Sequence, residues 1–175
     1  MAFTLLLGGA RSGKSELAVR LATASDRPVV VVVPAEPRDD EMAERIRRHR
    51  AARPAGWTTV EAPLGLEDTL GGLPADAFLL LDCLSLWVSN AIEVGASDAG
   101  LEEEARAIAG KLGAREAPAV VVTNEVGLGI VPVNELARRY RDVLGRVNAA
   151  FAGAASHAYF VVAGRVIPLG EPTLS

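Results

Sequence analysis

The sequence predicts an α/β fold in which a mostly parallel central sheet carries helices on both faces. Short apolar runs alternate with helical patterns along the whole chain, as they do in such folds. One run, Val29–Val33, consists of consecutive valines and is typical of a strand buried on both faces. A glycine-rich stretch separates the first apolar run from the first helical pattern. With 175 residues and no linker, the chain is expected to form a single domain over residues 1–175.

The first third of the chain contains two expected strands and two expected helices. The apolar run at 2–7 predicts a strand, and the pattern at 14–24 predicts the helix that follows it. After the valine strand, three acidic residues favour a helix N-terminus, so a helix is expected at 39–52. This helix ends at Arg53-Pro54, because a residue that precedes proline disfavours helical geometry.

The middle of the chain is built from shorter elements. Residues 57–61 read as a short strand that Pro63 stops, and residues 66–70 read as a short helix. The apolar run at 77–81 predicts another buried strand, which ends at Asp82. All of these elements are short enough to belong to one sheet with its crossover helices.

Two helices and a strand are expected next. A helix is expected at 85–94, and the small and polar residues 95–100 are expected to form a loop. Residues 101–112 have a polar first turn and read as an amphipathic surface helix. The apolar run at 119–123 predicts a further strand.

A long helix and a closing pair of strands complete the predicted fold. The helix is expected at 134–155, where apolar residues recur at spacings of three and four. The two strands are expected at 157–162 and 165–168, on either side of Gly164.

Composition limits the classes of function. The net charge of −4 gives no reason to expect a nucleic-acid partner. The single cysteine, Cys83, excludes an intrachain disulfide and suits a reducing compartment. No apolar stretch reaches the roughly 18 residues of a membrane span, and the N-terminus lacks the features of a signal peptide. We therefore expect a cytoplasmic protein.

The most informative motif is a phosphate-binding loop, G-x-x-x-x-G-K-S, between the first strand and the first helix. In such a loop, backbone N–H groups wrap a polyphosphate, and the helix dipole favours its negative charge. Lys14 would reach the β- and γ-phosphates, and the Ser15 hydroxyl would hold Mg²⁺. The motif predicts that a nucleoside triphosphate binds to Gly8, Gly9, Ala10, Arg11, Ser12, Gly13, Lys14 and Ser15.

Two acidic residues at strand ends are candidates for the same chemistry. Asp82 follows a buried strand, which is where an aspartate that supports Mg²⁺ stands in phosphate-loop enzymes. The alternative is a helix N-cap. Glu125 also lies at a strand end, where it would either orient a substrate hydroxyl or a metal-bound water, or cap the following loop.

His49 is one of two histidines and lies within the arginine-rich helix at 39–52. It shares a helical stripe with Ile46, so one interpretation is a histidine that packs against the sheet. The other is a nucleophile or acid–base group at a phosphate site, surrounded by guanidinium groups that bind phosphate oxygens. The arginines themselves also suit a solvated helix face. The second histidine, His157, has no polar cluster around it and reads as structural.

Several segments together resemble one family. They are the phosphate loop 8–15, the helical stretch 40–50 with Arg53-Pro54, and the stretch 122–132 with its continuation through 136–142 and 145–148. This combination is similar to the bifunctional adenosylcobinamide kinase/adenosylcobinamide-phosphate guanylyltransferase family of cobalamin biosynthesis. The resemblance covers nearly the whole chain. The phosphate loop is shared with many unrelated enzymes, whereas the stretch that begins at Asn124-Glu125 is far more specific.

The resemblance implies two reactions. ATP or GTP would phosphorylate a hydroxyl of adenosylcobinamide. GTP would then transfer GMP to a histidine with loss of pyrophosphate, and the GMP would pass to adenosylcobinamide phosphate to give adenosylcobinamide-GDP. The family pattern around that histidine matches this chain at Arg45, Ile46, His49, Arg50, Arg53 and Pro54. The resemblance therefore implies that His49 is the nucleophile, with Lys14 as a second catalytic residue.

The resemblance also implies further nucleotide contacts, a fold and an assembly. The implied contacts are Val33, Pro34, Ala35, Arg50, Ala51, Ala52, Arg53, Glu61 and Asp82. Pro34 and Ala35 stand where relatives have a small residue and threonine, so a hydroxyl contact is missing there. The implied fold is a RecA-like P-loop NTPase domain, and the implied assembly is a homotrimer.

Two other functions remain compatible with the residues alone. One is a phosphate-loop kinase for another small molecule, without guanylyltransferase activity. The other is a non-catalytic nucleotide-binding module, which would need neither Lys14 nor the Ser15–Asp82 pair.

Overall fold

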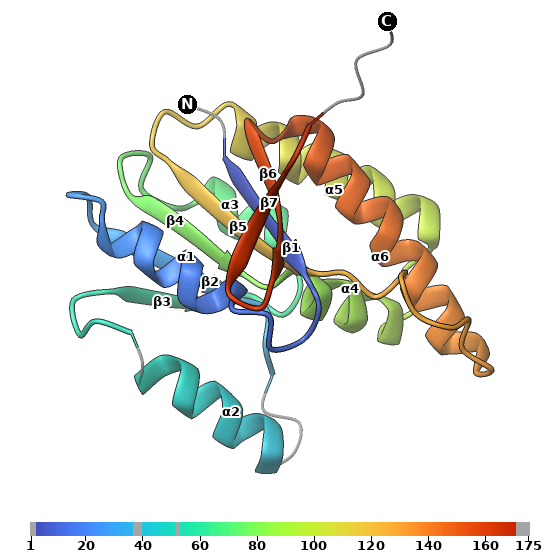
Figure 1. Ribbon diagram of the computed structural model, residues 1–175. Coiled ribbons are helices and arrows are strands. Elements are labelled where there is room, and N and C mark those ends of the chain that lie inside the picture. The colour runs from blue at the N-terminus through green and yellow to red at the C-terminus, as the bar shows by residue number, and fades with distance from the viewer. Residues whose placement is uncertain (1–2, 37–39, 52, 171–175) are drawn as a thin grey trace, which may run out of the picture.

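The computed structural model describes residues 3–36, 40–51 and 53–170. Its strands form one sheet in the order β3-β2-β4-β5-β1-β6-β7 (Figure 1). Every pairing among them is parallel except that of β6 with β7. The strands are β1 (Thr4–Gly8), β2 (Val29–Val33), β3 (Thr58–Glu61), β4 (Phe78–Asp82), β5 (Ala119–Asn124), β6 (His157–Val162) and β7 (Arg165–Leu169). The predicted fold class, a mostly parallel α/β sheet, is confirmed.

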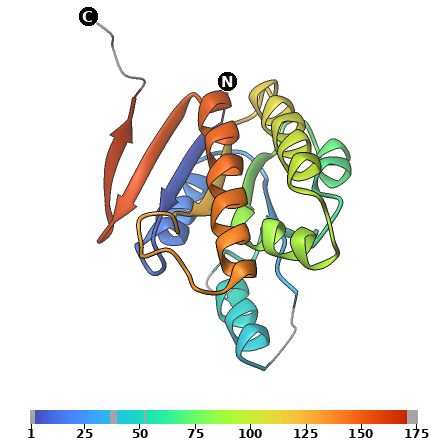
Figure 2. The same cartoon turned by 90° about the vertical axis from the view of Figure 1, so that its right-hand side faces the viewer.

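Helices cover both faces of this sheet (Figures 1 and 2). They are α1 (Lys14–Thr23), α2 (Asp40–Ala51), α3 (Leu66–Gly71), α4 (Leu84–Glu93), α5 (Asp98–Gly113) and α6 (Glu135–Ala154). On one face, Ala18 and Ala22 of α1 pack against buried strand residues such as Val31 and Leu80. The opposite face is covered by α3, α4, α5 and α6, whose apolar residues form the larger core. Because both faces are covered, all five valines of β2 are buried, as the sequence predicts.

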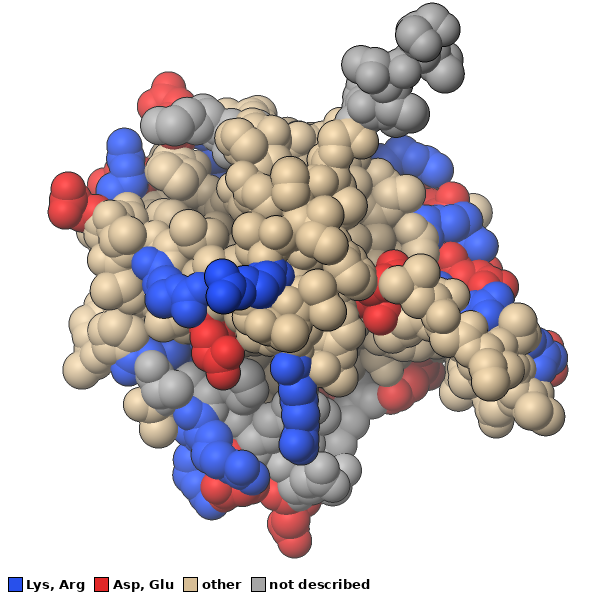
Figure 3. Space-filling view, in the orientation of Figure 1, with Lys and Arg blue, Asp and Glu red and all other residues tan. Residues whose placement is uncertain are grey.

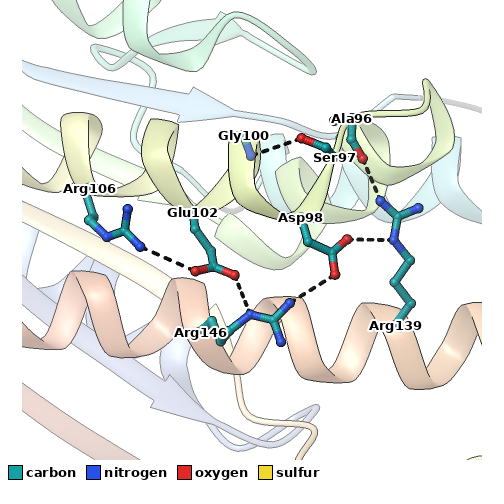
Figure 4. Close-up of polar contacts among 8 residues, drawn as sticks. All are labelled: Ala96, Ser97, Asp98, Gly100, Glu102, Arg106, Arg139 and Arg146. Atoms are coloured by element: carbon teal, nitrogen blue, oxygen red, sulfur yellow. Dashed lines mark hydrogen bonds and ion pairs between the residues drawn. The ribbon is translucent and has the colours of Figure 1, made fainter.

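The pair α5–α6 is joined by a row of ion pairs (Figure 4). Asp98 accepts hydrogen bonds from Arg139 at 2.8 Å and from Arg146 at 3.0 Å. Glu102 accepts from Arg106 and from Arg146. Asp98 and Glu102 thus each contact two guanidinium groups, and Arg146 links these two carboxylates. This network fixes α5 against α6 along the back of the sheet.

The expectation of a loop at 95–100 is wrong for its last three residues. The helix α5 begins at Asp98, three residues earlier than predicted. The Ser97 side chain accepts a hydrogen bond from Gly100 N–H and caps the helix. Asp98 in the first turn is also favourable to the helix dipole. These cap signals outweigh the small residues Ala99 and Gly100.

The sheet brings the chemically important strand ends to one edge. Gly8 of β1 lies opposite Asn124 of β5, and Asp82 of β4 lies opposite Val122 of β5. The phosphate loop, Asp82 and Asn124 therefore follow three adjacent strands at their carboxyl ends. This is the edge at which open α/β sheets bind ligands. No helix in the described part of the chain has the length and apolar character that a membrane span needs.

Candidate nucleotide site

A cleft of about 420 Å³ opens at this edge, between the phosphate loop and α2. Residues 10–15 line one side of it, and the ends of β2, β3, β4 and β5 form its floor. On the surface shown in Figure 3, positive and negative side chains gather in the lower part of the molecule, over α2. A volume of this size lies in the range of small-molecule sites.

The phosphate loop is held tightly by its neighbours. Lys14 is 6% exposed, and its Nζ donates to the carbonyl oxygens of Gly8 at 2.8 Å and Gly9 at 2.7 Å. The turn between β6 and β7 packs on the other side, where Gly164 N–H donates to Ser12 O at 2.8 Å. Gly13 adopts a left-handed φ of 99°, and a Cβ there would lie 3.1 Å from the Cα of Gly164. The loop thus requires glycine at this position for both its backbone conformation and its close packing.

Ser15 and Asp82 lie close enough to share a metal ion. The Ser15 hydroxyl donates to Asp82 Oδ1 at 3.5 Å, and both side chains line the cleft. A hydroxyl and a carboxylate are oxygen ligands of the kind that Mg²⁺ prefers, and Mg²⁺ completes its shell with phosphate oxygens and water. The two residues predicted to hold Mg²⁺ therefore fit this ion.

The arginines of α2 divide between two faces of the helix. Arg47 and Arg48 form ion pairs with Glu44 of the same helix on its exposed side. Ile46 and Arg50 line the cleft, and so does Arg53, just beyond the helix. Arg47 and Arg48 thus agree with a solvated helix face, whereas Arg50 and Arg53 agree with a phosphate-binding role. The backbone of His49 lies within α2, but its side chain is outside the described residues.

Arg53 is a half-buried cation in the cleft. Burial lowers the pKa of its guanidinium, the Asp82 carboxylate raises it, and the neighbouring Arg50 lowers it further. A guanidinium remains charged in proteins despite such shifts. The charged Arg53 thus lies near the Asp82 carboxylate. An anionic ligand bound in this part of the cleft would neutralise Arg50 and Arg53 together.

The far end of the cleft is formed by β2 and β3. Val33, Ala35 and Glu61 line it, as the predicted contacts require. Pro34 is buried, Ala51 of α2 is exposed, and neither residue lines the cleft. The predicted contact at Ala52 falls outside the described residues.

A buried polar cluster supports the floor of the site. The Asn124 side chain donates to Ser85 Oγ at 3.2 Å, and that hydroxyl lies 2.8 Å from Cys83 Sγ. Tyr140 donates to Ser85 O, and burial, with the nearby Cys83, raises the pKa of Tyr140 to about 12. Burial and the adjacent Asp82 also raise the pKa of the Cys83 thiol, so it stays protonated and is a poor nucleophile.

Glu125 behaves as a loop cap in this structure. Its carboxylate accepts a hydrogen bond from Gly127 N–H, and its own N–H donates to Gly8 O at 3.0 Å. The residue before it, Asn124, is the one that lines the cleft. Of the two interpretations for Glu125, the geometry agrees with the cap.

Several residues that line the cleft were not predicted to contact the nucleotide. They include Glu16, Thr59, Cys83, Leu86, Val122 and Asn124. The strand period of two places Thr59 on the same side of β3 as Glu61, which would have identified it. Leu86 belongs to α4, and no local signal indicates which turn of that helix reaches the cleft.

Comparisons with known proteins agree with this site. A model of the family described as cobinamide kinase / cobinamide phosphate guanyltransferase matches residues 4–169. The bifunctional adenosylcobalamin biosynthesis protein CobP of Pseudomonas aeruginosa is 45% identical over 170 residues, which is 96% of this chain and 98% of that protein. The bifunctional adenosylcobalamin biosynthesis protein CobU of Salmonella typhimurium is 38% identical over 174 residues, 91% of this chain and 95% of that protein.

A solved structure extends the comparison to the fold. The ATPase EscN of the enteropathogenic E. coli type III secretion system aligns with a TM-score of 0.57 and 11% identity, over 93% of this chain and 43% of that one. At this identity, the likeness shows a shared ATPase-type fold and nothing finer. The family match spans almost the entire described chain, and the alignments with the two relatives cover nearly the full length of each relative. The chain therefore belongs to the cobinamide kinase / cobinamide phosphate guanyltransferase family, the bifunctional enzymes of cobalamin biosynthesis.

Proposed function

We propose that this one domain, residues 1–175, performs both transfers in the cleft between the phosphate loop and α2. The first transfer moves a phosphoryl group from ATP or GTP to a hydroxyl of adenosylcobinamide. The second moves GMP from GTP to adenosylcobinamide phosphate by way of His49. The observation that carries this proposal is that one cleft joins the phosphate loop, the Ser15–Asp82 pair and the helix that contains His49.

In the first transfer, the acceptor's hydroxyl oxygen bonds to the γ-phosphorus. The bond from that phosphorus to the β–γ bridging oxygen breaks, the nucleoside diphosphate leaves, and the hydroxyl proton passes to solvent. Lys14 would exchange its contacts with Gly8 O and Gly9 O for phosphate oxygens. Ser15 and Asp82 would hold Mg²⁺, which when bound neutralises charge on the phosphates.

In the second transfer, a ring nitrogen of His49 bonds to the α-phosphorus of GTP. The bond from that phosphorus to the α–β bridging oxygen breaks, and pyrophosphate leaves. The phosphate loop would then hold the departing β- and γ-phosphates. A phosphate oxygen of adenosylcobinamide phosphate next attacks the same phosphorus and restores the free histidine.

The position of His49 in α2 suits this role. It stands three residues after Ile46, which lines the cleft, and this spacing places the two residues on one side of the helix. For attack, its ring nitrogen must come within roughly 3–3.5 Å of the α-phosphorus. Arg50 and Arg53 would bind the phosphate oxygens around that point.

The proposal includes nucleotide contacts with Val33, Ala35 and Glu61 at the far end of the cleft. The proposal assigns no contact to the Pro34 side chain. It also includes a homotrimeric assembly and a cytoplasmic location, the latter consistent with the free thiol of Cys83.

Labelling with GTP that carries a radioactive α-phosphate tests the proposal. The wild-type protein should take up acid-labile label and release pyrophosphate, because a phosphoramidate bond to histidine breaks in acid. His49→Ala should take up no label and should still phosphorylate adenosylcobinamide.

The second histidine provides a matched control. His157 lies at the start of β6, exposed and stacked on Tyr159, far along the chain from α2. His157→Ala should keep the wild-type label. Label retained by His49→Ala would overturn the assignment of the nucleophile, and a wild-type protein that phosphorylates the acceptor without taking up label would be a kinase alone.

A further inference from the structure

A proline follows each of the strands β2 and β3 on the cleft side. Pro34 follows β2, and Pro63 follows β3 by two residues. The pairing of the two strands continues as far as Ala62 N–H, which donates to Val33 O at 3.0 Å. Beyond that bond neither proline can donate, because proline has no N–H. Their carbonyl groups lie past the last bond between the two strands, so they take a donor from another element.

Asn90 of α4 supplies that donor to both carbonyls. Its side-chain nitrogen donates to Pro34 O at 2.7 Å and to Pro63 O at 3.0 Å. An amide nitrogen carries two hydrogens, so it can satisfy both carbonyl oxygens at once. Asn90 is 5% exposed, and its neighbours Val88, Ala91 and Ile92 are core residues. The donor therefore stands on a helix that is packed into the larger core.

The two clamped connections lead directly to the cleft. Ala35, which lines the cleft, follows Pro34, and Glu61, which also lines it, precedes Pro63 by two residues. The chain that leaves β2 through Pro34 continues into α2, which stands apart from the sheet (Figures 1 and 2). Pro34 is thus a fixed point between the sheet and the helix that carries His49.

The phosphate loop is held by a different set of contacts. Its supports are the Lys14 bonds to Gly8 and Gly9 and the Gly164 bond to Ser12. None of these bonds involves Asn90, Pro34 or Pro63. A change at Asn90 should therefore affect the α2 side of the cleft before it affects the phosphate loop.

We propose that Asn90 is a positioning residue for guanylyl transfer, which holds the Pro34 and Pro63 connections together so that α2 presents its catalytic side chain to the α-phosphate. This inference rests on the proposed function. Asn90 acts through the backbone of two loops and touches no reacting atom. Phosphoryl transfer, whose groups belong mainly to the phosphate loop, depends on Asn90 less.

Two substitutions test the role of the amide. Asn90→Asp keeps the size of the side chain and replaces the donor with an oxygen that repels both carbonyls. Asn90→Leu removes the polarity and keeps most of the volume. At saturating nucleotide, we expect the rate of label uptake from α-labelled GTP to fall about tenfold or more in both variants. The kinase turnover of the same preparations should fall by no more than about threefold.

Asn148 of α6 provides a matched control. It is 4% exposed, and its side-chain nitrogen donates to Asn124 O at 3.0 Å, so it is also a buried amide bonded to a backbone carbonyl. Asn148→Asp should change guanylylation and kinase turnover by the same factor and leave their ratio at the wild-type value. If the substitutions only loosened the packing, the ratio of guanylylation to kinase turnover would stay near the wild-type value in the Asn90 and the Asn148 variants alike.

The outcomes separate this inference from the proposed function. A wild-type protein that takes up no label contradicts the proposed function. A wild-type protein that takes up label, with Asn90 variants at the wild-type ratio, overturns the role of Asn90 alone. Equal shifts of the ratio in the Asn90 and Asn148 variants also overturn it. So does loss of kinase turnover in both Asn90 variants, because the amide would then serve the whole fold.

Discussion

Two crossover helices of this molecule, α5 and α2, are held in opposite ways. The apolar face of α5 is buried in the core through Leu101, Ala105 and Ile108, and its carboxylates pair with arginines of α6 (Figure 4). In α2, the ion pairs of Glu44 remain within the helix itself, and its described side chains are exposed or half-buried. The helix stands off from the sheet, with the cleft between them.

The difference separates stability from ligand binding. In α5, most charged groups have protein partners, so the helix adds packing and fixed electrostatics to the scaffold. In α2, Arg50 and Arg53 face a cleft, and an anionic ligand would be their natural counter-charge. A helix with little core packing is also easier to displace, which suits an element that must bring a nucleophile to a bound nucleotide.

The largest expected effect on stability is that of a substitution in the core of α5, which a matched isoleucine in α2 allows us to compare. Ile108 of α5 is fully buried in the core, whereas Ile46 of α2 is half-buried on the cleft. Ile108→Ala should lower the free energy of unfolding by about 3 kcal/mol, because it leaves a cavity. Ile46→Ala should lower it by less than about 1 kcal/mol. Urea denaturation of both variants measures the difference, and equal losses would contradict the contrast between the helices.

The second prediction concerns activity. Arg53→Ala should slow guanylyl transfer by roughly 10- to 100-fold, because a half-buried cation beside the α-phosphate is lost. Its unfolding free energy should stay within about 0.5 kcal/mol of the wild type. Arg106→Ala is the control, since Arg106 pairs with Glu102 of α5 and does not line the cleft. Steady-state kinetics with both variants would contradict the prediction if Arg106→Ala slowed guanylyl transfer as much.

The smallest effects are expected from the ion pairs. Arg146→Ala removes bonds to both Asp98 and Glu102 and should cost about 1 kcal/mol of stability at low salt. Arg47→Ala removes an exposed pair within α2 and should cost less than about 0.5 kcal/mol. Thermal unfolding at low and at high salt should show a salt-dependent loss for Arg146→Ala only. The same loss for Arg47→Ala would contradict the difference between the ion pairs of α2 and those of α5.

Much of the fold follows from local patterns in the sequence. The valines of β2, the glycines of the phosphate loop and the apolar spacing of α6 each depend on neighbouring residues, so they predict their elements without tertiary information. The site edge follows as well, because parallel strands bring Ser15 and Asp82 together at their carboxyl ends.

The rest of the site depends on contacts between distant parts of the chain. The Asn90 bonds join the helix α4 to two separate connections, at Pro34 and at Pro63, and no local spacing in the sequence predicts them. The division of the α2 arginines also needs the structure, because it depends on which face of the helix meets the cleft. The start of α5 is different, since the Ser97 cap was present in the sequence and its small neighbours obscured it.

The turn between β6 and β7 has a consequence for the way the protein is made. Gly164 N–H bonds to Ser12 O, and a Cβ on Gly8 would lie 2.2 Å from Val161 O. The phosphate loop is synthesised before its packing partner, because β6 and β7 follow all the other strands and helices in the chain order. Because such distant contacts form only once both segments are available, a nascent chain that stops before β6 has the loop's sequence without its shape. Nucleotide-binding competence therefore comes only after β6 and β7 have been synthesised.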